Sequence, residues 1–117
     1  MGRRGRRRGR DRVAVSEYTD PDGSVLKLRD RLSEGTLREL RDLPARAAAS
    51  QEDRFARKSE LLFERLAVEW TIAGLPLTGQ KELLGRLRLA DADTRAWVRA
   101  TIDRHLSEHQ PEAADVT

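Results

Sequence analysis

Two histidines are the side chains in this sequence that suit proton or metal chemistry near neutral pH. His105 and His109 stand four residues apart in a predicted helix, a spacing that lets two imidazoles hold one metal ion. Glu108 is misplaced for a His-Glu-x-x-His motif, and no third ligand follows nearby in the sequence. We therefore expect two solvent-exposed histidines and no metal site.

Carboxylates and glycines elsewhere have local structural explanations. Asp20 and Asp22 belong to a turn, and Asp91 or Asp93 can cap a helix. General acid–base catalysis needs carboxylates held in a dry cleft, which a small core offers little room to build. The glycines of the first ten residues lack the preceding strand and following Lys-Ser/Thr of a phosphate loop. The sequence predicts no catalytic residues, no cofactor and no enzymatic activity.

The first twelve residues form an arginine-rich arm. They contain seven Arg and one Asp, so this segment carries a net charge of +6 and the rest of the chain −3. Clustered guanidiniums bind phosphate with a steep salt dependence, and without aromatic residues between them little sequence preference is expected. The arm is a nucleic-acid-binding segment, a solubilising tail or an upstream extension of a frame starting at Val13 or Val15. The candidate nucleic-acid-binding residues are Arg3, Arg4, Arg6, Arg7, Arg8, Arg10 and Arg12.

Composition predicts the size of the core and the cellular compartment. Leu, Ile, Val and Phe make up 22% of the 117 residues and charged residues 37%, which predicts one small domain of marginal stability. The chain has no Cys, no apolar run of about 20 residues that could span a bilayer, and no hydrophobic stretch after its basic N-terminus. We expect a cytoplasmic protein without a membrane anchor.

A turn and four capping signals predict the elements that carry these residues. Apolar residues on both sides of Asp20-Pro21-Asp22-Gly23 predict a β-hairpin within residues 13–28. A capping box at Thr36 begins a short helix that Pro44 ends, and a second box at Ser50 begins the longest helix. We expect that helix to run past Trp70 to a stop at Gly74 and Pro76.

Two further helices complete the predicted fold. Thr78 is the expected N-cap of a short helix, and Asp91 or Asp93 that of the last. The fold class is therefore mainly α, with four helices of unequal length, a short N-terminal hairpin and a disordered arm. The expected organisation is a basic arm over residues 1–12, a helical domain over 13–110 and a polar tail over 111–117.

An apolar stripe on the longest helix and two tryptophans are the candidates for contact with a partner. Stripe residues recur at spacings of three, four and seven, as on one face of a helix. Tryptophan is enriched at binding hot spots, although packing in or beside the core is the more common role of such residues. The candidate partner-binding residues are Phe55, Leu62, Phe63, Leu66, Trp70 and Trp97.

The order of motifs along residues 17–109 carries a resemblance to a known family. A β segment with Glu17-Tyr-Thr-Asp-Pro-Asp-Gly23 is followed by a helix ending in Leu61-Leu-Phe-Glu-Arg-Leu-Ala-Val-Glu-Trp70. A turn opening Gly74-Leu-Pro-Leu-Thr-Gly-Gln-Lys-Glu-Leu-Leu84 leads to Trp97-Val-Arg-Ala-Thr-Ile102. This arrangement resembles tail-assembly chaperones of siphophages and related prophages of actinobacteria. The arginine-rich arm lies outside that pattern.

The resemblance implies a concrete role. Such a chaperone binds the long, helical, aggregation-prone tape-measure protein in the host cytoplasm until tail-tube protein displaces it. Two other functions stay open: a small nucleic-acid-binding protein that uses the arm, and a structural phage protein such as a connector. The sequence does not indicate an oligomeric state.

Overall fold

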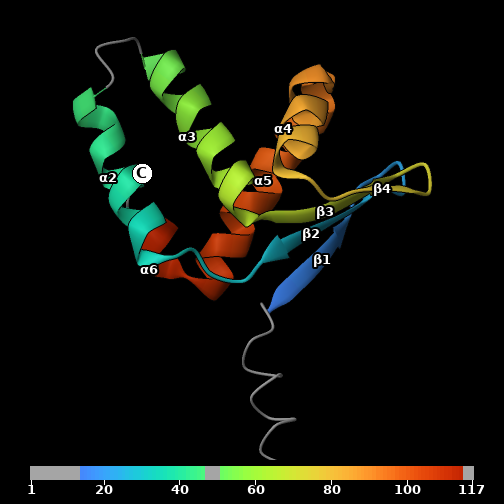
Figure 1. The fold of residues 1–117 in the computed structure, drawn as a ribbon, viewed down its shortest axis with the longest axis horizontal. Helices are drawn as coiled ribbons and strands as arrows, with labels where there is room; N and C mark the ends of the chain where they lie inside the picture. The colour runs from blue at the N-terminus through green and yellow to red at the C-terminus, as the bar shows by residue number, and fades with distance from the viewer. Residues whose placement is uncertain (1–13, 47–50, 115–117) are drawn as a thin grey trace, which may run out of the picture.

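The computed structural model describes residues 14–46 and 51–114 of the chain. Within these residues, five helices accompany a four-stranded antiparallel sheet, which is an α+β architecture (Figure 1). The prediction of a mainly α fold with four helices and one short hairpin is therefore wrong. The arginine-rich arm lies outside the described residues.

The N-terminal hairpin forms at the predicted turn. Strand β1 (Val15–Thr19) pairs antiparallel with β2 (Val25–Arg29). The side chain of Asp20 stabilises the turn, because its Oδ1 accepts the N–H groups of Asp22 and Ser24 at 2.8 and 2.9 Å. Gly23 takes a φ of +90°, which glycine adopts without a steric cost. Local turn chemistry was therefore enough to predict this hairpin.

A second hairpin stands where the C-terminal part of the helix predicted to begin at Ser50 was expected. Helix α3 (Gln51–Leu66) ends at Leu66, and the chain continues directly as strand β3 (Ala67–Ile72) and then β4 (Leu75–Leu77). The strand order is β1-β2-β3-β4, with a register shift between Lys27 and Leu28 where β2 pairs with β3. Trp70 therefore lies on a central strand and not on a helical face.

Residue types explain why a strand forms there. The segment Ala67–Ile72 contains Val, Trp, Thr and Ile, which pack well on a pleated surface. Ala73 and Gly74 both take positive φ, +53° and +79°, as the two central residues of a type I′ hairpin turn do. Pro76 lies on edge strand β4, where a missing N–H is tolerated. Gly74 and Pro76 therefore belong to a hairpin and not to the end of a helix.

The helix boundaries differ by a few residues from the predicted caps. Helix α2 (Glu34–Arg46) begins before Thr36, whose N–H is accepted by Ser33 Oγ at 3.1 Å, and it continues beyond Pro44. Helix α4 (Gln80–Leu89) has Gly79, not Thr78, at its N-cap. Asp91 does cap helix α5 (Ala92–His109), because its Oδ1 accepts the N–H of Thr94 at 2.7 Å. The short helix α6 (Pro111–Ala114) follows, and its Ala113 is buried.

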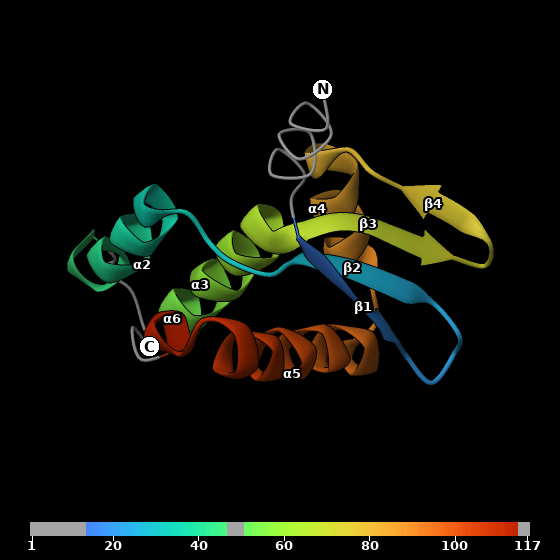
Figure 2. The ribbon, with the colours of Figure 1, turned by 90° about the horizontal axis from the view of Figure 1, so that it is seen from below.

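The core lies between the sheet and the helices. Leu26 and Leu28 of β2 and Trp70 of β3 are buried, together with Phe63 of α3 and Ile102 of α5. Figure 2 shows α5 along one side of the molecule, with β1 crossing toward it. No helix in the described parts of the chain is long and apolar enough to cross a membrane.

Candidate functional site

Helices α3, α4 and α5 line an open groove with a volume of about 730 Å³. We call this feature the helical groove. Its apolar lining side chains come from all three helices, and most of them are also part of the core. These residues are Phe55, Ala56 and Leu62 of α3, Leu87 of α4, and Val98, Ile102 and Leu106 of α5.

Phe55 differs from the other large apolar residues of the helical groove because it is exposed. It keeps 55% of its surface accessible, whereas Leu62 keeps 4% and Ile102 keeps 3%. The guanidinium carbon of Arg99 lies 5.3 Å from the centre of the Phe55 ring, within the range of a cation–π contact. The groove therefore has a buried apolar floor and an aromatic side chain at its edge that this chain leaves in water.

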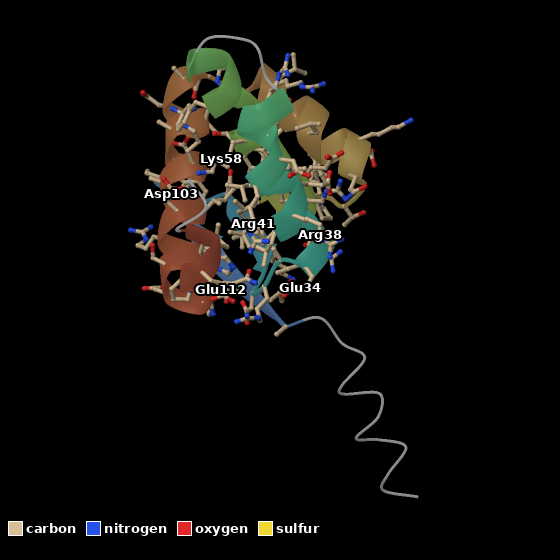
Figure 3. All side chains as sticks on the ribbon, turned by 90° about the vertical axis from the view of Figure 1, so that its left-hand side faces the viewer. Glu34, Arg38, Arg41, Lys58, Asp103 and Glu112 are labelled. Carbon is tan, nitrogen blue, oxygen red and sulfur yellow. The ribbon has the colours of Figure 1, made fainter. Side chains whose placement is uncertain are left out.

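Charged side chains surround the apolar floor, and positive ones predominate. Arg88 donates two hydrogen bonds to Glu60, at 2.8 and 3.0 Å, and this pairing lowers the pKa of the Glu60 carboxyl. Burial lowers the pKa of Lys58, against the attraction of Asp103. Figure 3 shows Lys58 on α3 and Asp103 on α5, two neighbouring helices. The lining contains four basic residues, Lys58, Arg88, Arg95 and Arg99, and two acidic ones, Glu60 and Asp103.

The structure separates the predicted partner-binding residues into two groups. Phe55 and Leu62 line the helical groove. Phe63, Leu66 and Trp70 are fully buried in the core. The rings of Phe63 and Trp70 pack edge to face, with their centres 5.7 Å apart. Trp97 is half-buried against the core. The packing role expected for both tryptophans is confirmed. Sequence reasoning missed the α5 wall of the groove, although Val98, Ile102 and Leu106 recur every four residues, as on one face of a helix.

The two histidines lie in a second polar region, between α5 and the strands β1 and β2. His105 is fully buried, so the prediction that it is solvent-exposed is wrong. Its Nε2 lies 2.7 Å from the carbonyl oxygen of Arg29, and its Nδ1 lies 2.6 Å from the Tyr18 hydroxyl. Burial lowers the pKa of His105, so the neutral ring is favoured. A carbonyl can only accept, so Nε2 carries the proton and Nδ1 accepts the Tyr18 hydroxyl.

His109 lies one helical turn further along, beside residues that are distant in sequence. Its Nδ1 is 3.9 Å from Asp30 Oδ1, and its Nε2 is 3.4 Å from Ser16 Oγ. Ser16 in turn donates to Asp30 Oδ1 at 2.6 Å. Asp30 precedes His105 by 75 positions in the sequence. The spacing of ligands along the sequence therefore could not show that Asp30 lies beside the two histidines. The fold therefore places a carboxylate beside the histidine pair.

Comparison of the chain with protein-family models, curated proteins and solved structures gave no match.

Proposed function

We propose that this protein binds an amphipathic helix of a partner protein in the helical groove, and that it acts as a tail-assembly chaperone for a tape-measure protein. The observation that supports the proposal is the groove itself, with its apolar floor and exposed Phe55. Binding would take place in the host cytoplasm. The protein would keep its partner soluble until tail-tube protein replaces it.

The shape and chemistry of the groove favour a helical partner. Amphipathic helices bind such grooves through apolar residues at spacings of three, four and seven, the pattern of a helical face. Burying Phe55 would remove its exposed apolar surface from water, which is favourable by about 25 cal/mol per Å². A tape-measure protein is a long chain of helices, so it would offer many such faces.

The charges around the groove define the partner further. With four basic and two acidic lining residues, the rim attracts a helix whose polar flanks are acidic. Rim charges mainly affect the association rate and the orientation of a partner, whereas buried apolar contacts supply most of the affinity. We therefore expect salt to slow binding without abolishing it.

Co-expression tests the proposed function directly. The full chain would be produced together with a siphophage tape-measure protein, and the soluble fraction of that protein would be measured. Phe55→Asp should abolish the rescue, because it places a carboxylate at the apolar edge of the groove.

Leu75 provides a matched control for that substitution. It is also a large exposed apolar residue, with 70% of its surface accessible, but it lies on β4 and not in the groove. Leu75→Asp should leave the rescue intact. Absence of any rescue by the wild-type chain would contradict the chaperone proposal, and equal effects of the two substitutions would contradict the role of the groove.

Nucleic-acid binding by the arm is the second candidate, supported by the charge of +6 over residues 1–12. These residues lie outside the described part of the chain, so the proposal depends on sequence alone. Duplex DNA binding would be compared between the full chain and a chain that starts at Val13. Equal binding by both chains would show that the arm is not the DNA-binding segment.

A further inference from the structure

We propose that Asp30, His105 and His109 form a binding site for a divalent transition-metal ion, with Zn²⁺ as its representative. One ligand atom from each residue can be chosen so that all three lie within 4.8 Å of one another. Two imidazoles and one carboxylate are a ligand set that zinc and related metals accept. The proposal is independent of the helical groove, which is lined by other residues.

The hydrogen bonds of His105 fit the pattern of a metal ligand. Metal-binding histidines generally donate the second ring N–H to a carbonyl or carboxylate, which fixes the tautomer and turns the free nitrogen toward the metal. His105 donates from Nε2 to the carbonyl oxygen of Arg29, so Nδ1 is the nitrogen that keeps a lone pair for a metal ion. At present that lone pair accepts the hydroxyl proton of Tyr18. A metal ion would take the place of this proton at Nδ1.

The backbone on both sides of the three residues is fixed by hydrogen bonds. On one side, His105 Nε2 donates a hydrogen bond to the carbonyl oxygen of Arg29. On the other side, the buried amide of Gln110 accepts from the N–H of Leu32 at 2.7 Å and donates to its carbonyl at 3.2 Å. Asp30 follows the first contact, and His109 precedes the second. The ligands therefore sit between two fixed points, so only side-chain adjustment is needed to close the site.

The required adjustment is small, and solvent can reach the site. Ligand atoms around a tetrahedral zinc ion lie about 3.4 Å apart, given bond lengths of about 2.1 Å. From separations of up to 4.8 Å, the side chains must therefore approach by about 1 Å or somewhat more. The side chains of Asp30 and His109 are 24% and 33% exposed, which leaves a path for the ion. Three protein ligands would leave a fourth position for water, as in catalytic zinc sites.

Zinc titration of the full chain, without a histidine tag and after treatment with a chelator, tests the proposal. Calorimetry should show one Zn²⁺ per chain, and saturation should raise the melting temperature. Loss of a residue that only orients a ligand costs about 10–100-fold in affinity, so loss of a ligand should cost at least about 100-fold. His109→Ala and Asp30→Asn should each weaken binding by that factor. Both positions are partly exposed, and Asn retains an oxygen for the Ser16 hydroxyl, so these variants should fold.

Asp103→Asn is the matched control for Asp30→Asn, because it makes the same change in an exposed carboxylate of α5 outside the cluster. It should leave zinc affinity within about twofold, since Asp103 supplies no ligand atom and its exposed carboxylate is screened by water and salt. Absence of equimolar binding by the wild-type chain would overturn the proposal and leave the cluster as a hydrogen-bond network alone. Equimolar binding that survives either His109→Ala or Asp30→Asn would overturn it as well.

Discussion

The helical groove differs from the contact between α5 and the N-terminal hairpin in what it buries. The hairpin contact buries polar side chains, and the groove leaves a large apolar side chain exposed. At the hairpin contact His105 is buried, and just beyond it Gln110 is buried against Leu32. The chain itself supplies partners for the polar atoms of both side chains. At the groove, Phe55 remains exposed to water at the edge of a buried apolar floor, within a rim of charges. The first region is completed by the fold, and the second would be completed by another molecule. Substitutions in the two regions should therefore separate stability from binding.

The largest expected effect comes from the floor of the groove, which is shared with the core. Ile102→Ala should lower the free energy of unfolding by about 2–5 kcal/mol, because it removes buried atoms and leaves a cavity. Urea unfolding followed by circular dichroism would measure this change. A loss below about 1 kcal/mol would show that the floor is not part of the core and would weaken the contrast between floor and edge.

The polar contact should show the next largest effect. Gln110→Ala should cost about 2–3 kcal/mol, because it leaves a buried N–H and a buried carbonyl of Leu32 without their partners. Gln80→Ala is the control: Gln80 is exposed, so its single hydrogen bond to the Glu64 carbonyl should contribute well under 1 kcal/mol. If the two substitutions cost the same in urea unfolding, the contact at Leu32 is not the fixed point that the structure indicates.

Tyr18→Phe should have a smaller effect in the same region. The substitution leaves Nδ1 of buried His105 without the hydroxyl that it now accepts, and this should cost about 1–2 kcal/mol. Urea unfolding in the presence of a chelator would measure the loss without a contribution from bound metal. A neutral result would mean that water replaces the hydroxyl and that the contact is not dry.

Turn residues predicted the first hairpin correctly. At the second hairpin, Gly74 and Pro76 were wrongly predicted to end a helix. Asp20-Pro21-Asp22-Gly23 has the side chains and the glycine that its turn requires, so local signals were sufficient. Ala73-Gly74 forms a two-residue turn with an alanine at positive φ, a conformation that costs a non-glycine residue about 1–2 kcal/mol. Pairing of β3 with β2, which is distant in sequence, supports this turn. Propensity within a short window could not predict that pairing.

The two sites show the same limit of sequence reasoning. The spacing of His105 and His109 was visible, but Asp30 joins them only because β2 ends beside α5. The apolar stripe of α3 was also visible, but its members differ in burial. Leu62 lies in the floor of the groove, whereas Phe55 lies at its edge. Periodicity shows which residues share a helical face, and tertiary packing decides which part of that face is covered.

Phe55→Ala should have the smallest effect on stability and a large effect on binding. An exposed side chain away from caps and buried networks usually changes the free energy of unfolding by no more than about 0.5 kcal/mol. A partner helix would bury the ring, and loss of such an aromatic anchor typically costs about 2 kcal/mol or more in binding. Urea unfolding and calorimetric titration with a tape-measure segment would measure the two quantities on the same protein. A stability loss as large as that of Ile102→Ala would show that the edge belongs to the core, and the contrast between the two regions would then fail.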